Sequence, residues 1–360
     1  MYTITGFNHC ELYVGNAKQT AFYYGQTMGF KIIAYRGLET GSRDQVSYVL
    51  KQGKIYFVVT SPLKAKTEIG RHIDIHGDGI KDVAFTVDDA TKAWEYSQEK
   101  GAESVKQPTK IVDKFGEAII SSVRTFGDTI HTFVEKINYS GVFLPGYEKY
   151  DQNYNSESLG LCHIDHVVGN QPDGQMQPVC DFYEKVFGWH RFWTVDDDDI
   201  TTEYSSLRSI VMANDNEIIK MPINEPAEGL RKSQIQEFID YYATAGIQHI
   251  ALSTKDIIKS VKIMRQNGVE FLPTPDNYYG NLEKRIGNMN EDIQDLKKLG
   301  ILVDKDQDGY MLQIFTKPLQ DRPTLFFEII QREGSQSFGK GNFKELFKSI
   351  EREQRSRGNL

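Results

Sequence analysis

The chain has 360 residues, more than one small core needs, which indicates two domains with a further segment appended. Hydrophobic residues make up 39% of the chain and aromatic residues 12%, enough for sizeable cores. The formal net charge of -8 and the absence of a long basic run in the sequence argue against a nucleic-acid-binding protein.

Cysteine usage and hydropathy indicate the compartment. Cys10, Cys162 and Cys180 are scattered and form no CxxC pair, so the sequence predicts neither a disulfide framework nor a thiolate metal site. No window approaches the apolar length of a membrane span, and the first residues lack the pattern of a signal peptide. We therefore expect a cytoplasmic protein without a membrane partner.

The first half of the chain alternates strand-like runs with helical stretches. Helices are expected around residues 18–28, ending at Gly29, and over residues 89–100. The strand-like runs are rich in β-branched and aromatic residues; they cover residues 7–14, 30–35, 45–50, 55–60, 81–87, 118–123 and 131–136. Two successive units of strand, helix and further strands therefore make up this half.

The second half repeats this plan. The helical stretch 182–189 matches 23–30 in length, with Gly188 in the place of Gly29, and the run 247–252 matches 80–85. Internal repeats decide a fold, so we predict an α+β protein in which each half is a pair of βαβββ modules. This plan resembles the vicinal-oxygen-chelate arrangement of glyoxalases, bleomycin-resistance proteins and dioxygenases, and the resemblance implies two open barrels whose curved sheets each enclose a cup.

Composition sets the predicted boundaries. The stretch around 138–158 is rich in Gly, Tyr, Asn and Ser, as in a linker. We predict an N-terminal domain over 1–140, a linker over 141–159, a C-terminal domain over 160–332 and a C-terminal segment over 333–360. In that last segment Phe343, Leu346, Phe347 and Ile350 follow helical spacing. The helix either packs on the barrel surface or acts as a lid, and both roles are compatible.

Glu328 is the one carboxylate within the apolar strand-like run 323–332. A buried carboxylate is costly unless it is paired or bound to a metal. His166 and His249 lie in similar strand-like settings, and two imidazoles with one carboxylate form the triad that holds non-haem Fe(II) with open positions. Each residue taken alone is more often a hydrogen-bonded core residue; the three together, with the motifs around them, favour a metal site.

Superposing the two halves on sequence places the triad on His9, Asp82 and Glu135 of the first half. That set lacks one imidazole. We therefore expect one metal ion per chain, and we interpret the N-terminal domain as a degenerate copy without metal that serves the structure.

Several longer motifs point to one family. The segments 222–226, 233–236, 247–252, 312–318 and 338–343 closely resemble 4-hydroxyphenylpyruvate dioxygenases, and the resemblance runs from about residue 5 to the end of the chain. It implies an Fe(II)-dependent oxidoreductase that converts 4-hydroxyphenylpyruvate and O2 to homogentisate and CO2 in tyrosine and phenylalanine catabolism. No 2-oxoglutarate is implied, because the substrate carries its own 2-oxo acid. We also expect a homo-oligomer, a dimer or a tetramer.

The resemblance also suggests the residues around the substrate. Catalytic polar residues would be Ser209, Asn224, Gln234 and Gln313, with Gln248 as a further binding residue. The apolar wall would consist of Pro222, Phe315, Phe326, Phe338, Phe343 and Phe347. Strand alternation supports Gln313 with Phe315 and Phe326 with Glu328. It does not support Gln248, which as the neighbour of His249 should point away unless the strand bulges.

Three alternatives remain open at this stage. 4-Hydroxymandelate synthase shares the fold, metal and substrate, but the Pro222 to Asn224 motif and Phe315 resemble the homogentisate-forming branch. A glyoxalase-type enzyme would need an added carboxylate at the metal. A non-catalytic binding or resistance protein is disfavoured by the intact triad.

Overall fold

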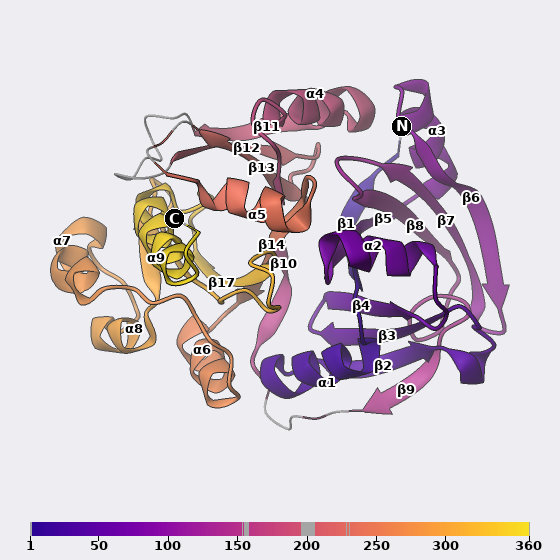
Figure 1. The fold of residues 1–360 in the computed structure, drawn as a ribbon, viewed down its shortest axis with the longest axis horizontal. Coiled ribbons are helices and arrows are strands. Elements are labelled where there is room, and N and C mark those ends of the chain that lie inside the picture. Colours follow the sequence, from indigo (N-terminus) through magenta and orange to yellow (C-terminus); the bar gives the residue numbers. More distant parts are fainter. Residues whose placement is uncertain are drawn as a thin grey trace.

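The computed structural model describes residues 2–152, 154, 158–195, 206–227, 229 and 231–359. Two curved sheets lie side by side, one from each half of the chain (Figure 1). Among the residues described, no helix has the length and apolar character needed to cross a membrane.

The first half contains β1 (Ile4–Tyr13), α1 (Ala17–Met28), β2 (Lys31–Arg36), β3 (Gln45–Gln52), β4 (Ile55–Pro62), α2 (Glu68–His76), β5 (Gly79–Val87), α3 (Ala90–Glu99), β6 (Ser104–Asp113), β7 (Gly116–Arg124), β8 (Ile130–Ile137) and β9 (Glu148–Gln152). Its strands form a nine-stranded sheet in the order β6-β7-β8-β5-β1-β4-β3-β2-β9.

The second half contains β10 (Leu161–Asn170), α4 (Met176–Phe187), β11 (His190–Val195), β12 (Ser206–Ala213), β13 (Lys220–Ala227), α5 (Gln234–Tyr242), β14 (Gly246–Thr254), α6 (Ile257–Gln266), α7 (Leu282–Ile286), α8 (Ile293–Leu299), β15 (Leu302–Lys305), β16 (Tyr310–Phe315), β17 (Phe326–Glu333) and α9 (Lys340–Ser356). Its strands form an eight-stranded sheet in the order β11-β12-β13-β10-β14-β17-β16-β15.

Each half is built from two βαβββ modules, as predicted. In both halves the first strands of the two modules pair antiparallel, β1 with β5 and β10 with β14. Each of these strands also pairs parallel with the last strand of its own module. The four innermost strands of each sheet therefore have the same arrangement, which gives both halves the same curved cup.

Matched helix ends confirm the repeat. Gly29 follows α1 and Gly188 follows α4, with φ of 71° and 69°. This left-handed conformation costs glycine little, so it ends both helices at the same place in the module. The side chains of Asp89 and Asp256 likewise accept hydrogen bonds from backbone N–H groups in the first turns of α3 and α6.

One strand lies where we predicted only a linker. β9 falls within 141–159 and pairs antiparallel with β2 at the edge of the first sheet. The ring of Tyr150 packs 5.8 Å from that of Tyr35 and 5.9 Å from that of Tyr48. The polar composition of the segment predicted a linker. The strand is held on the sheet by the ring of Tyr150, and a single tyrosine in a polar segment does not predict a strand.

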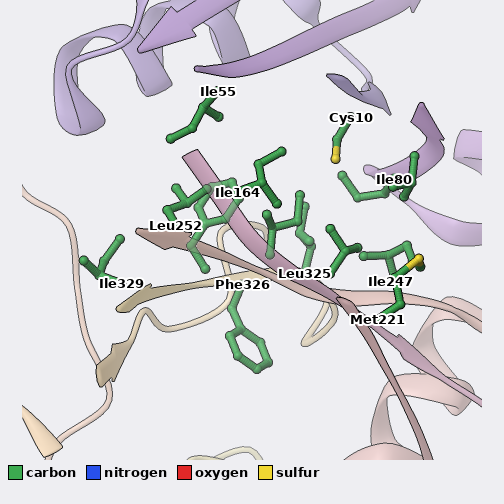
Figure 2. Close-up of a cluster of buried hydrophobic side chains, with 14 of the residues drawn as sticks. Cys10, Ile55, Ile80, Ile164, Met221, Ile247, Leu252, Leu325, Phe326 and Ile329 are labelled. Carbon is green, nitrogen blue, oxygen red and sulfur yellow. The ribbon is translucent and has the colours of Figure 1, made fainter. Parts of the chain in front are cut away.

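An apolar core joins the two halves. Ile55 of the first half lies on the side of Ile164 and Leu252 of the second, and Ile80 on the side of Ile247 (Figure 2); all of these residues are buried. On β17 the side chains alternate as predicted. Phe327 stacks on Phe57 of the first half at 5.4 Å, while Phe326 turns its ring to the other side of the sheet (Figure 2). The face of β17 that carries Phe326 and Glu328 is therefore the one turned away from the first half.

Candidate metal centre

The predicted triad residues lie on three adjacent strands, β10, β14 and β17. His166 on β10 lies opposite Ala251 on β14, and Ala251 pairs in turn with Glu328 on β17. His249 lies two residues before Ala251, on the same face of β14. This register brings His166, His249 and Glu328 together with their ligand atoms within 4.8 Å of one another.

The three side chains face each other through matched atoms. Glu328 Oε2 lies 3.2 Å from Nε2 of His166 and 3.5 Å from Nε2 of His249. The other oxygen, Oε1, is buried and has no hydrogen-bond partner among the described residues. A buried oxygen without a partner is costly, and a cation between the carboxylate and the two imidazoles would remove that cost. The donor set is that of the two-histidine, one-carboxylate triad, so the residues present fit a divalent metal ion.

Burial and mutual attraction shift the three pKa values. Burial raises the pKa of Glu328, but attraction to His166 and hydrogen bonds from both imidazoles outweigh it and lower the pKa. Burial lowers the pKa of His166, yet Glu328 and Asp165 raise it overall to about 9. The pKa of His249 stays below its usual value because burial prevails there. The carboxylate is thus held ionised in a dry pocket, as a metal ligand must be.

Hydrogen bonds behind the rings orient both histidines. His166 Nδ1 lies 2.7 Å from Asp165 Oδ1, and His249 Nδ1 lies 3.0 Å from Gln248 Oε1. Each of these acceptors takes the Nδ1–H proton in a hydrogen bond, so Nε2 is the ring atom that faces Glu328. Nε2 donates to that carboxylate in the metal-free site and, once deprotonated, would offer its lone pair to a metal ion. Strand alternation gave Gln248 no place beside the metal; its contact is with the back of a ligand ring.

A small cavity of about 40 Å³ adjoins the triad. Among the predicted substrate residues it is lined by Ser209, Pro222, Asn224, Gln313, Phe315 and Phe338. Four further lining residues were missed: Val168, Val211, Trp193 and Leu346. Alternation would have found Val168 and Val211, which stand two residues after His166 and Ser209 on their strands. No sequence signal marks Trp193.

The remaining predicted residues lie elsewhere. Gln234, Gln248 and Phe326 line a neighbouring cavity of about 30 Å³. Phe326 nevertheless stacks on the ring of His249 at 4.8 Å, so it touches the triad from behind. Phe347 is buried in a small cluster with Leu207 and Ile235. The side chain of Phe343 lies outside the described part of the structure.

Known proteins resemble the chain over nearly its whole length. The family model described as "Hydroxyphenylpyruvate dioxygenase, HPPD, N-terminal" matches residues 2–155, and that of the "Glyoxalase/Bleomycin resistance protein/Dioxygenase superfamily" matches 163–314. The 4-hydroxyphenylpyruvate dioxygenase of Xenopus tropicalis is 52% identical over 364 residues, which cover 98% of this chain and 92% of that protein. The enzyme of the same name from Aspergillus fumigatus is 49% identical over 378 residues, 99% of this chain and 94% of its own. The chain belongs to the 4-hydroxyphenylpyruvate dioxygenase family.

Solved structures agree with this family's fold. A mutant 4-hydroxymandelate synthase from Streptomyces coelicolor superposes with a TM-score of 0.87 at 31% identity, over 98% of this chain and 99% of that one. A fusion protein that joins a xylose isomerase-like TIM barrel to a 4-hydroxyphenylpyruvate dioxygenase superposes with a TM-score of 0.76 over 97% of this chain and 53% of its own, and at 20% identity it supports the fold alone. The predicted fold class is confirmed.

In this member of the family, α9 is fixed at both ends over the cup. At its start, Asn342 donates to Gln313 Oε1 at 3.2 Å, and Gly339 lies so close that a Cβ there would come within 2.0 Å of the same oxygen. At its end, Arg357 and Asn359 each donate to the carboxylate of Glu237 on α5 at 2.8 Å. The helix thus packs on the barrel and also covers the cavity, through Leu346.

The first half of this dioxygenase-family chain has a counterpart to the triad, but not the one predicted. Asp82 pairs with Ile130, and Phe85 with Phe133, so Thr132 takes the place of Glu328. Glu135 instead takes the place of Gln331. Both side chains accept a hydrogen bond from the first N–H of the helix in their own module: Glu135 from Ala90 at 3.0 Å and Gln331 from Ile257 at 2.8 Å.

The predicted superposition on Glu135 is therefore wrong by three residues. It followed the aromatic residues that precede each acid, whereas strand register decides which residue faces the cup. The true counterpart set is His9, Asp82 and Thr132. Asp82 accepts hydrogen bonds from the backbone N–H and the hydroxyl of Thr132. Burial raises the pKa of Asp82 to about 8 and lowers that of His9 to about 3.

Proposed function

We propose that the chain is an Fe(II)-dependent 4-hydroxyphenylpyruvate dioxygenase, which converts its substrate and O2 to homogentisate and CO2 in tyrosine and phenylalanine catabolism. The observation that carries the proposal is a buried His166, His249 and Glu328 group in a chain 52% identical, over 98% of its length, to an enzyme of that name. The two parts of this observation support each other. The relatives are named as dioxygenases of this substrate, and the three side chains would supply the ligands for the metal of such an enzyme.

Fe(II) would be held by Nε2 of His166, Nε2 of His249 and the carboxylate of Glu328, one ion per chain. Three protein ligands leave open positions on such a metal. Bound there, Fe(II) supplies a chelation site for the 2-oxo acid and the electrons that activate O2. A separate 2-oxoglutarate has no role, because the substrate brings its own 2-oxo acid. The N-terminal domain would hold no metal and serve the structure.

The polar residues of the cup would orient the substrate. Ser209 and Asn224 lie opposite one another on β12 and β13, and both line the triad cavity together with Gln313. Their hydroxyl and amide groups can donate to and accept from the phenol and the keto acid. Gln234 and Gln248 line the neighbouring cavity together with Phe326. Gln248 would orient the ring of His249 through its Nδ1, and Gln234 would support the wall formed by Phe326.

The apolar residues would exclude water. Phe315 and Phe338 line the cavity, and their rings contact those of His249 at 6.1 Å and His166 at 5.1 Å. A cavity of about 40 Å³ holds only a few water molecules. A phenylpyruvate is larger, so α9 and the segment before it would move outward for entry and close again over the bound substrate.

The test is product identification after Fe(II) is added without oxygen and O2 is then admitted. Homogentisate is the expected main product. The second candidate function, 4-hydroxymandelate synthesis, is favoured by the structural likeness to an enzyme of that name, and hydroxymandelate as the main product would establish it. Phe315→Ile should divert part of the flux to hydroxymandelate, because a smaller wall lets the ring and its side chain shift toward the metal.

Location and assembly stay predictions. We expect a cytoplasmic protein, and the three cysteines, all free thiols in the structure, are compatible with a reducing compartment. We also expect a homodimer or homotetramer, which sedimentation equilibrium of the purified protein would distinguish from a monomer.

A further inference from the structure

Arg332 lies behind the candidate metal centre. It follows Glu328 by four residues on β17, so the two side chains share a face of the strand. Its Nε donates to Oδ2 of Asp165 and its Nη2 to Oδ1, both at 2.8 Å. This is the two-pronged contact for which the planar guanidinium is suited. Asp165 Oδ1 also accepts from His166 Nδ1, so the arginine reaches the ligand ring through one carboxylate.

The same guanidinium holds the chain that covers the cavity. Nη1 donates to the backbone oxygen of Ser337 at 2.6 Å and to that of Ser335 at 3.3 Å. Its Cζ lies 5.5 Å from the ring centroid of Phe338, and that ring packs edge-on against His166. One side chain therefore contacts both the carboxylate behind the ligand and the segment in front of it.

The first half offers an internal comparison. Asn8 stands in the place of Asp165, and its Oδ1 lies 2.8 Å from Nδ1 of His9. Lys136 stands in the place of Arg332, with its Nζ 5.8 Å from the ring centroid of Phe143. Phe143 in turn packs edge-on against His9 at 5.2 Å, just as Phe338 packs on His166.

A phenylalanine therefore packs edge-on against the first histidine of each half, whichever pair of polar residues stands behind that histidine. An asparagine and a lysine suffice for it in the first half. The carboxylate and the guanidinium stand in the half that has the two histidines and the glutamate. Packing alone does not account for this difference, which follows the metal ligands.

We propose that Arg332 is a positioning residue for the metal centre. Through Asp165 it fixes the ring of His166 with Nε2 toward the metal, and through Ser337 it ties that orientation to the placement of Phe338 over the cavity. The proposal rests on the function proposed above for its metal. Loss of such outer contacts commonly weakens metal affinity by about 10- to 100-fold.

The test measures Fe(II) affinity by anaerobic titration and the visible spectrum of the Co(II)-substituted protein, so that neither readout depends on turnover. Asp165→Asn and Arg332→Lys should each weaken Fe(II) binding by about 10- to 100-fold and alter the Co(II) bands. Because both substitutions break the same contact, the double variant should bind Fe(II) no more weakly than the single variant of lower affinity. The double variant also recreates the pair found in the first half, so it should fold.

Asp306→Asn is the matched control. Asp306 accepts from Ser335 Oγ, Gln336 N and Ser337 N at 2.6 to 3.0 Å, so it holds the same segment, yet none of these contacts reaches Asp165. We expect this variant to raise KM for the substrate and to leave metal affinity and Co(II) bands unchanged. Wild-type affinity in Arg332→Lys, or an equal loss in Asp306→Asn, would overturn the proposal. A wild-type enzyme that binds Fe(II) but forms no homogentisate would instead refute the proposed function and leave the affinity comparison intact.

Discussion

The two halves of this chain share a strand plan, and they satisfy a buried carboxylate in opposite ways. In the first half, Asp82 is closed off by two hydrogen bonds from Thr132. In the second half, Glu328 faces two imidazoles and keeps one oxygen without a partner among the described residues. A buried carboxyl group needs either local hydrogen-bond partners or, when it is ionised, a cation. The halves differ at two of the three positions: Asp82 stands in the place of His249, and Thr132, which stands in the place of Glu328, supplies the hydrogen bonds that Asp82 needs.

The largest expected effect comes from removing a ligand in the second half. Glu328→Ala and His249→Ala should each reduce turnover to below about one-hundredth of wild type, since even outer-shell changes cost 10- to 100-fold. Metal analysis should show that the purified variants have lost their iron. Asp82→Asn, the matched change in the first half, should keep both iron and activity. Iron retained in Glu328→Ala, or lost in Asp82→Asn, would contradict this division between the halves.

The next effect concerns α9, which covers the cup of the second half. Deleting residues 339–360 should preserve Fe(II) binding but lower turnover by about tenfold or more, with extra O2 consumed without product, because water then reaches the metal. Glu237→Gln is a milder variant that weakens only the contacts of Arg357 and Asn359 at the helix end. Its turnover should lie between those of the deletion and the wild type. Coupled wild-type turnover in the deletion would make the helix a packing element only.

A third prediction rebuilds the missing site. Asp82→His combined with Thr132→Glu places two imidazoles and a carboxylate in the register of the second half. Iron binding should rise from one to two ions per chain, the second weaker by about 10- to 100-fold because Asn8 and Lys136 replace the aspartate and arginine behind the ligand. Asp82→His alone, which lacks the carboxylate, is the control. One ion in both variants would mean that register does not suffice.

The smallest effect is on stability. Burial raises the pKa of Asp82 to about 8, whereas an unfolded aspartate ionises near 3.8. Between these values the unfolded chain has lost a proton that the folded chain keeps, so rising pH favours unfolding. Asparagine does not titrate. The Tm of Asp82→Asn minus that of the wild type should therefore increase from pH 4 to pH 8 and stay constant above pH 8. Calorimetry that finds a constant difference would assign the carboxylate another state.

Much of the candidate metal centre in the second half could be predicted from the sequence alone. Alternation along β17 put Glu328 and Phe326 on one face, because the side-chain period of a strand is fixed. The same rule could not place Gln248, whose contact is sideways to a neighbouring ring, nor Trp193, whose strand lies at the far edge of the sheet. Glu135 was mistaken for the counterpart of Glu328 because strand register depends on pairing between strands, which a sequence motif does not encode. β9 escaped notice because its tyrosine lies within an otherwise polar segment.

β17 serves the two halves at once. One face carries Glu328, and the other presses Phe327 against Phe57 of the first half. The first half thus forms the back wall of the strand that supplies Glu328 to the candidate metal centre. A substitution at Phe57 would loosen that wall, and its effect would reach Glu328 through Phe327 although Phe57 lies in the other half.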